Sequence, residues 1–333
     1  MKWFRNLRQR KSKGMNTDIF FISFLANVDS SFQSLKLKDG FSVKNMSLDE
    51  CTEFVIKLKK HAPSVNEHIV MPILILNGFT NMEKKIYYIS NSINIELKSG
   101  TDIYDYLSFN PGSQGFSNFH NTSIEYIQIL MEKLRLFKTG YIDSIWTFCY
   151  YICDDGSIMN FGLPILTKFI QTIDLEYGNY LLDSSDSQKF ERFSNKTQLP
   201  FINKNLNLSH ENFEKSYGNN SREICFLTLM IGMEILFNKF HSELIYRISR
   251  GVGVLLGRNI NGEKSEKIIS DMKRFYKLRS SIVHNGEAKI TNVDILKLRQ
   301  YLRESIQELH NLNQEKDDYI PYLESLGYNQ RFK

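Results

Sequence analysis

One arginine and one histidine stand five positions apart in the stretch FYKLRSSIVHNGE, residues 275–287. An arginine guanidinium donates forked hydrogen bonds to a phosphate. A histidine changes charge near neutral pH and is therefore suited to proton transfer. Together, Arg279 and His284 have the chemistry needed to cleave a phosphodiester. The alternative is that this stretch is the end of an ordinary helix that carries both side chains by chance.

The spacing alone does not decide between these alternatives, because the chain holds a second such pair, Arg303 and His310. The second pair lies in YLRESIQELHNL, which has the pattern of a charged surface helix. The first pair has apolar neighbours, and Asn285-Gly286 directly after it is a helix-stopping signal. A cation in the last turn of a helix is favoured by the helix dipole. The context therefore favours Arg279 and His284 as the functional pair.

Helix geometry raises an objection to a site built from one chain. Residues five positions apart are separated by about 140° around the helix axis and roughly 7.5 Å along it. The side chains of Arg279 and His284 therefore do not converge within one copy. A two-fold dimer removes the objection, because facing helices bring two arginines and two histidines to a shared cleft. We therefore expect a homodimer.

The C-terminal half of the chain is predicted to position this pair within a helical bundle over residues 199–312. Its apolar residues recur with helical periodicity, and short loops join the helices, which favours antiparallel packing. The sequence predicts helices over 209–217, 221–240, 242–257, 263–284 and 291–312, the last opened by a capping box of Thr291 and Asp294. Residues 313–333 form a tail of unknown role.

The predicted helix 221–240 is apolar nearly all round, which is typical of a buried central helix. Glu234 is the exception, and a buried carboxylate needs a partner. Arg247 is the nearest candidate for a structural ion pair. A role in orienting Arg279 or His284 is the alternative.

The N-terminal half has a mixed pattern that predicts an α+β domain over residues 15–180. Strands are expected at 19–28, at 34–46 with an Asp-Gly turn inside, at 69–79, at 84–97, and as a hairpin within 142–164. Helices are expected at 47–60, opened by a capping box of Ser47 and Glu50, and at 122–137. Residues 1–14 read as a basic tail, and the polar, aperiodic segment 181–198 is predicted to be a linker.

The net charge of +5 is mild but unevenly distributed. Between His241 and Arg279 there are nine Lys or Arg residues against four Asp or Glu residues. This surplus of positive charge is compatible with a phosphate-bearing partner. A solvated helix face is the alternative.

Cysteine usage and hydropathy exclude several classes of protein. The four cysteines, Cys51, Cys149, Cys153 and Cys225, are too few and too scattered for a disulfide framework. Cys149 and Cys153 lack the spacing and the neighbouring histidine of a zinc site, so we expect buried thiols in a reducing cytoplasm. No apolar run reaches the roughly 18–20 residues of a membrane span. The sequence therefore predicts a cytoplasmic protein without metal, cofactor or membrane partner.

Three stretches, SREICFLTLMIGMEILFN, ELIYRISRGVGVLLG and FYKLRSSIVHNGE, resemble the HEPN superfamily in its ApeA-like branch. HEPN domains are helical bundles, commonly dimeric, and many are metal-independent ribonucleases with an R-x(4–6)-H motif. Arg279 and His284 match that motif. Many relatives place Asn, Asp or His directly after the arginine, whereas this chain has Ser280, which still offers a hydrogen bond.

The resemblance implies an endonuclease whose partner is RNA, either single-stranded or in a tRNA loop. In this reaction the ribose 2′-OH attacks the adjacent phosphodiester, giving a 2′,3′-cyclic phosphate and a 5′-OH. His284 is then the general base or acid, and Arg279 holds the phosphate and stabilises the transition state. Ser280, Asn285 and Glu234 are candidate supporting residues. Candidate contacts to the RNA backbone are Arg247, Arg250, Lys273, Arg274 and Lys277.

Family context further suggests an antiviral defence (abortive infection) effector. The N-terminal domain is then a sensor or regulatory domain that binds a trigger ligand or a phage protein. A non-catalytic HEPN dimerisation or binding module in a regulatory complex is the alternative. A protein with surface charge but no nucleic-acid role is a third possibility.

Overall fold

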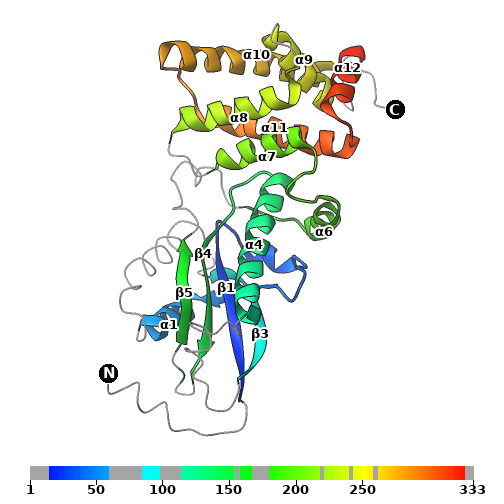
Figure 1. The fold of residues 1–333 in the computed structure, drawn as a ribbon. Coiled ribbons are helices and arrows are strands. Elements are labelled where there is room, and N and C mark those ends of the chain that lie inside the picture. The colour runs from blue at the N-terminus through cyan, green and yellow to red at the C-terminus, as the bar shows by residue number, and fades with distance from the viewer. Residues whose placement is uncertain are drawn as a thin grey trace. The chain divides into compact units, whose positions relative to one another are not determined.

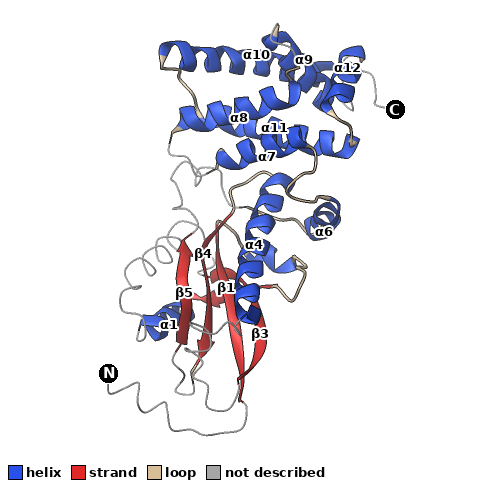
Figure 2. Ribbon diagram, in the orientation of Figure 1, coloured by secondary structure: helices blue, strands red, loops and turns tan. Residues whose placement is uncertain are grey.

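The computed structural model describes residues 15–59, 85–97, 114–153, 156, 158–166, 180–217, 221–239, 243–257 and 262–326. These residues divide into two compact units (Figure 1). The first contains the described residues up to Arg135, those within 140–170 and those within 178–194. The second contains 136–139 and the described residues from Asn195 onward. Strands lie in the first unit and the second is built of helices (Figure 2), so the predicted α+β region followed by a helical region is confirmed.

The first unit is built on an antiparallel sheet with the strand order β2-β3-β1-β4-β5. Its strands are β1 (Met15–Ala26), β2 (Ser42–Ser47), β3 (Lys85–Leu97), β4 (Asp143–Ile152) and β5 (Ile158–Leu166). The predicted strand 69–79 lies outside the described residues. The central strand β1 pairs on both sides, with Phe21 opposite Asn91 of β3 and Cys149 of β4.

Both faces of β1 are covered, because successive side chains of a strand point to opposite faces. On one face, Ile22 and Phe24 pack with Cys51 and Leu58 of α1 (Leu48–Lys59). On the other face, the ring of Phe21 meets that of Phe119 of α4 (Gln114–Phe137) edge-on at 6.5 Å. The sheet therefore forms the middle layer of the first unit.

The cysteines that were expected to be buried thiols are free, and three of them are buried, whereas Cys153 is partly exposed. Burial raises the pKa of Cys51 and of Cys149 to about 12. Both thiols therefore stay protonated at neutral pH.

The predicted capping box at the start of α1 is confirmed. The Ser47 amide donates to Glu50 Oε2 at 2.7 Å, and the Glu50 amide donates to Ser47 Oγ at 3.1 Å. The strand predicted over residues 34–38 was wrong. Residues 35–37 have no regular secondary structure and follow a short 3-10 helix (η2, Ser30–Ser34) that Asp29 caps and that buries Phe32. Only the part after the Asp39-Gly40 turn is a strand.

The predicted linker 181–198 contains a helix, α6 (Asp186–Lys196). Asp186 accepts a hydrogen bond from the Asp183 amide at 2.9 Å, and Phe190 is buried. Lys133 donates to the Ser194 carbonyl at 2.8 Å. The sequence missed this helix because Phe190 and Phe193 are its only apolar residues, too few to give a clear apolar periodicity.

The second unit contains the five predicted helices, each within a few residues of its expected bounds. They are α7 (Lys204–Lys215), α8 (Arg222–Phe237), α9 (Leu244–Gly257), α10 (Gly262–Asn285) and α11 (Asn292–Leu312). Helix α8 packs against α7, α9, α10 and α11, so its predicted central position is confirmed. The Thr291–Asp294 capping box of α11 is also confirmed.

Helices α9 and α10 approach each other closely along a glycine-bearing face of α9. A Cβ atom added at Gly253 would lie 2.5 Å from Cγ1 of Ile269, and one added at Gly257 would collide with Ser265. This close approach requires glycine and fixes α10 against the rest of the unit.

The tail after Asn313 forms a docked helix, α12 (Lys316–Ser325). Tyr319 is buried, and its hydroxyl donates to the Leu236 carbonyl at the end of α8 at 2.8 Å. Lys316 donates to the neighbouring Ile235 carbonyl at 2.5 Å. Helix α12 thus supplies partners to the last carbonyls of α8, which helix geometry leaves free.

In the described part of the chain, no helix is both long and apolar enough to cross a membrane.

Candidate active site

His284 lies in the last turn of α10, which ends at Asn285 as the Asn-Gly pair predicted. Gly286 adopts the left-handed conformation with φ of 77°, and its amide donates to the Ile282 carbonyl at 3.0 Å. The Asn285 side chain donates to Ser281 Oγ at 3.4 Å. These contacts hold the helix end, and the His284 side chain is exposed to solvent there.

Arg279 lies on the same helix and is held by Glu234 of α8. Its Nε atom is 3.3 Å from Glu234 Oε1. The guanidinium also lies over the ring of Tyr276, at 5.8 Å from the ring centroid. The Arg279 side chain nevertheless remains 28% exposed, so it can still reach a phosphate from solvent. Ser280, the next residue, is partly buried.

The ion pair predicted between Glu234 and Arg247 was wrong. Arg247 instead forms an ion pair with Glu324 of α12 at 2.5 Å and lies 3.9 Å from Glu243 on its own helix. Because α12 docks beside α9, it offers Arg247 a carboxylate that the sequence did not place near it. The alternative expectation, that Glu234 orients Arg279, agrees with the observed contact.

Burial raises the pKa of Glu234 above its ordinary value, and the opposing effect of Arg279 is smaller. Among the described residues, its buried Oε1 atom has no aligned hydrogen bond. Burial likewise raises the pKa of Tyr276, with the Glu234 charge as the next cause. The carboxylate is therefore costly where it stands, and the contact that it makes is with Arg279.

The second arginine–histidine pair was predicted to lie on a charged surface helix, and this prediction was wrong. Arg303 is only 4% exposed and donates to Thr139. His310 is partly buried, and burial lowers its pKa. Arg303 is thus committed to a buried contact in a way that Arg279 is not.

The five candidate RNA contacts separate into two groups. Arg250 donates to the carbonyls of Leu323, Glu324 and Leu326 at the end of α12. Arg247 and Arg274 lie in ion pairs, the latter with Asp294 at 2.5 Å. Lys273 and Lys277 are exposed, and neither forms an ion pair with a described residue. Among the described residues, the two lysines are therefore the members of the set that are exposed and have no ion-pair partner, whereas Arg274 is exposed but paired.

Burial alone would raise the pKa of Asp294, but hydrogen bonds from Arg274 and Thr291 hold it below its usual range. The carboxylate also completes the capping box of α11. Arg274 thus helps to fix the start of α11.

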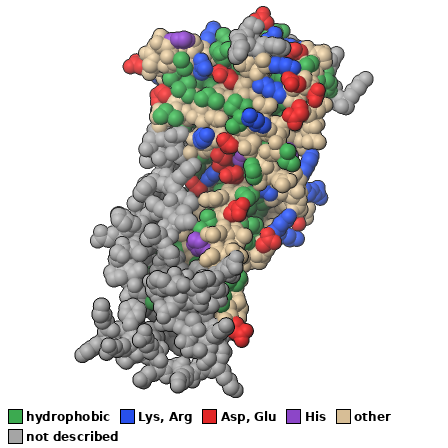
Figure 3. All heavy atoms as spheres, in the orientation of Figure 1, with side chains coloured by type: hydrophobic (Ala, Val, Ile, Leu, Met, Phe, Trp, Pro, Cys, Tyr) green, Lys and Arg blue, Asp and Glu red, His purple; other side chains and the backbone are tan. Residues whose placement is uncertain are grey.

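Two features near Arg279 and His284 were not predicted from the sequence. Ile224 and Ile231 of α8 are 52% and 45% exposed, so this helix is not buried all round. They are seven residues apart and therefore share one face, and Val283 of α10 is 52% exposed as well. Apolar side chains gather over α8 and α10 on the face seen in Figure 3. Periodicity could not reveal this face, because the other faces of α8 are equally apolar.

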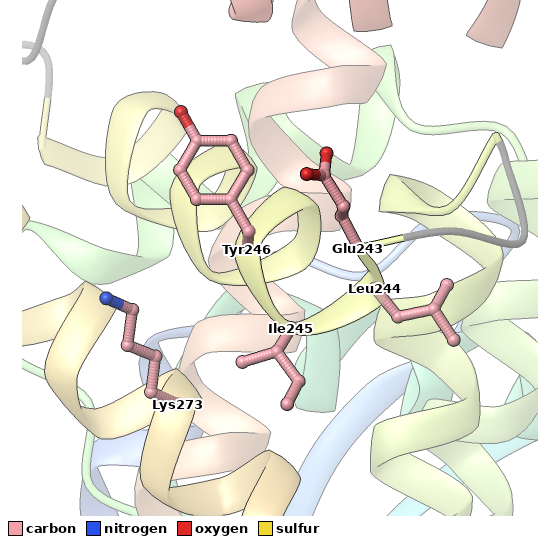
Figure 4. A pocket seen from close by; sticks show the side chains of 5 residues that line it. All are labelled: Glu243, Leu244, Ile245, Tyr246 and Lys273. Atoms are coloured by element: carbon pink, nitrogen blue, oxygen red, sulfur yellow. The ribbon is translucent and has the colours of Figure 1, made fainter.

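The second feature is a shallow pocket of about 470 Å³ at the start of α9. It is lined by Glu243, Leu244, Ile245, Tyr246 and Lys273 (Figure 4). Only Lys273 was expected to take part in binding. The sequence carried no signal that could have located it, because the exposure of Tyr246 is seen only in the structure.

The geometry brings Arg279, Glu234 and Tyr276 together and leaves His284 exposed one and a half turns further along α10. In the described part of the chain, no group of three or more His, Cys, Asp or Glu side chains could hold a metal ion. Comparisons with family models, with curated proteins and with solved structures found no match to this chain.

Proposed function

We propose that the chain is a metal-independent RNA endonuclease whose catalytic residues are Arg279 and His284. The observation that carries this proposal is that both side chains on α10, Arg279 and His284, are accessible to solvent. Arg279 is held by Glu234 and is still 28% exposed, and His284 is exposed at the helix end. A purely structural pair would be buried and satisfied, as Arg303 is. The resemblance to HEPN ribonucleases supports the same conclusion.

The reaction uses the substrate's own nucleophile. His284 takes the proton of a ribose 2′-OH, and the oxygen attacks the adjacent phosphorus. The 5′-oxygen leaves and takes a proton from a second histidine, giving a 2′,3′-cyclic phosphate and a 5′-OH end. Arg279 contacts the phosphate and stabilises the charge that builds up in the transition state. Glu234 positions the guanidinium for this contact.

The second histidine comes from a second copy of the chain. Arg279 and His284 are about 140° apart on one helix, so one copy does not direct both at the same phosphate. The exposed apolar face of α8, with Ile224 and Ile231, gives the second copy a surface to bury. A two-fold arrangement across this face places two copies of α10 beside one cleft.

The resemblance also leads us to propose an abortive-infection role in antiviral defence. In that role the N-terminal α+β unit binds a trigger, either a ligand or a phage protein, and controls the nuclease. A non-catalytic dimerisation module is the alternative function, because the exposed face of α8 serves dimerisation whether or not RNA is cut.

RNA cleavage by the purified full chain tests the proposal. Cleavage should persist in excess chelator, and His284→Ala should lower the rate by roughly 100- to 10,000-fold, which is the usual contribution of a general acid or base. The product ends should be a 2′,3′-cyclic phosphate and a 5′-OH. His120→Ala is the matched control, because His120 lies on α4, outside the candidate active site, and this variant should retain the full rate.

Three results would contradict the nuclease mechanism. They are cleavage that survives His284→Ala, cleavage that the chelator abolishes, and products with 5′-phosphate ends. A wild-type chain that dimerises but cuts no RNA would instead favour the non-catalytic module.

A further inference from the structure

The pocket at the start of α9 leaves a large aromatic side chain without cover. Tyr246 is 55% exposed and its neighbour Ile245 is 41% exposed. Figure 4 shows the Tyr246 ring and the Lys273 ammonium group on the same side of the pocket. An aromatic face open to solvent beside a cation is an arrangement that stacks a base and holds the adjoining phosphate. The pocket therefore has the chemistry of a single-stranded nucleic-acid site.

A ridge on α10 joins this pocket to the candidate active site. Lys273, Tyr276 and Arg279 follow one another at intervals of three residues, and residues so spaced are neighbours on a helix surface. The Arg279 guanidinium already lies over the Tyr276 ring. The ridge rises about 9 Å along the helix axis and winds about 120° around it, so a strand that follows it spans several nucleotides at the 3.4 Å axial spacing of a stacked strand.

The lining contains one acidic group, Glu243, which would repel a phosphate. Arg247 lies 3.9 Å from its carboxylate and offsets part of that charge. Lys273 forms no ion pair with a described residue. Arg247 is also paired with Glu324 at 2.5 Å, so Glu243 keeps part of its negative charge, and Lys273 is the cation of the pocket lining.

We propose that this pocket binds one unpaired base of the RNA substrate. The inference rests on the proposed function, which it deepens by naming single-stranded RNA as the substrate class. Tyr246 stacks on the base, and Ile245 packs against the edge of the same base. Lys273 contacts the adjoining phosphate, and the strand follows the ridge from there to Arg279.

Binding of fluorescently labelled single-stranded RNA oligonucleotides to the full-length His284→Ala chain tests the base contact without cleavage. Tyr246→Ala should weaken binding by roughly 5- to 150-fold, the range that the loss of one stacked base produces. Tyr246→Phe retains the ring and should bind as tightly as the parent. Ile202→Ala, at a site 90% exposed in the same unit, is the control for loss of surface apolar area.

The salt dependence of binding tests the phosphate contact separately. Lys273→Ala should reduce the slope of log affinity against log salt by about 0.7, the contribution of one phosphate contact on a single strand. Tyr246→Ala should leave that slope unchanged. Lys204→Ala, which removes an exposed lysine of α7, should change neither the slope nor the affinity.

Equal binding of the parent and Tyr246→Ala would overturn the subsite, and so would an absence of any RNA binding. A protein assembly that depends on Tyr246, with RNA affinity unaffected, would overturn it in favour of a protein interface. The two proposals fail separately. If RNA binding depends on Tyr246 but the wild-type chain cuts no RNA, the nuclease proposal is contradicted and the subsite proposal stands. If the wild-type chain cuts RNA and Tyr246→Ala changes neither binding nor cleavage, the subsite proposal is contradicted and the nuclease proposal stands.

Discussion

At the scale of single residues, Glu234 is the side chain whose position most needs an explanation. It is a partly buried carboxylate on an otherwise apolar helix, and its neighbourhood raises its pKa. A partly buried charge without an aligned hydrogen bond lowers stability. The proposed function accounts for it, because Glu234 holds the Nε edge of Arg279 while the guanidinium stays accessible.

The raised pKa of Glu234 predicts how stability depends on pH. The folded chain binds this proton more tightly than the unfolded chain does, so the contribution is most favourable below the ordinary pKa of 4.5. It is lost as pH rises from there through the raised folded-state pKa. Glu234→Gln cannot ionise, so its unfolding free energy should improve relative to wild type between pH 4 and pH 7. Urea unfolding at several pH values measures this difference.

Glu223 on the same helix provides a control of opposite sign. A hydrogen bond from Ser221 lowers the pKa of Glu223, so this carboxylate stabilises the fold above its ordinary pKa and loses that effect as pH falls. Glu223→Gln should therefore lose stability relative to wild type as pH rises through the lowered folded-state pKa to the ordinary value of 4.5, and should change little relative to wild type above it. If both glutamine variants drift in the same direction, the explanation given for Glu234 is incorrect.

At the scale of elements, α8 contributes to the core with one face and exposes apolar side chains on another, and its amino-acid composition does not distinguish the two faces. Phe226, Met230 and Met233 form part of the core, whereas Ile224 and Ile231 face solvent. Exposed apolar side chains on one helix face are typical of an interface. The proposed second copy covers this face, and α10 lies beside it with Val283 also exposed.

Ile231→Glu should convert the proposed dimer to a monomer. Because Ile231 is 45% exposed in one copy, the substitution leaves the monomer fold intact. In the dimer it buries an unpaired charge, which costs several kcal/mol and should weaken association by at least about 100-fold. Light scattering after size-exclusion chromatography measures the mass, and RNA cleavage should fall together with the dimer.

Ile202→Glu is the matched control for that experiment, since Ile202 is 90% exposed and lies outside α8, in the loop before α7, and it should leave the mass unchanged. A wild-type chain that is monomeric at micromolar concentration would contradict the interface. So would an Ile231→Glu variant that remains a dimer.

At the scale of the whole molecule, periodicity and capping signals predicted helices α7 to α11 of the second unit and most strands of the first, but not α12. The Asn285-Gly286 stop and the Thr291–Asp294 box were placed correctly because both are local. Partners were harder to predict, because they depend on elements far apart in the sequence. Arg247 pairs with Glu324 because α12 docks beside α9. Arg303 is buried and donates a hydrogen bond to Thr139, which lies far from it in the sequence.

The candidate site shows the same division between local and distant information. The identities of Arg279 and His284 follow from their motif and the helix end. That Glu234 holds Arg279 follows from the packing of α8 on α10, which periodicity does not specify. Tyr246 was missed because an exposed aromatic residue has the same pattern as a core residue until its neighbours are known.

A composite active site makes a prediction that belongs to the dimer as a whole. Arg279→Ala and His284→Ala should each be inactive as homodimers. When the two variants are mixed and allowed to exchange subunits, about half of the dimers should contain one of each. Such a heterodimer holds one intact arginine and one intact histidine on different chains, so it keeps the phosphate contact and one of the two proton transfers. If the cleft is shared, it should regain part of the wild-type cleavage rate, above the rate of either homodimer. A mixture that exchanges subunits, as verified by mass, and cleaves no faster than the two homodimers would contradict a shared cleft in which one histidine supports partial activity.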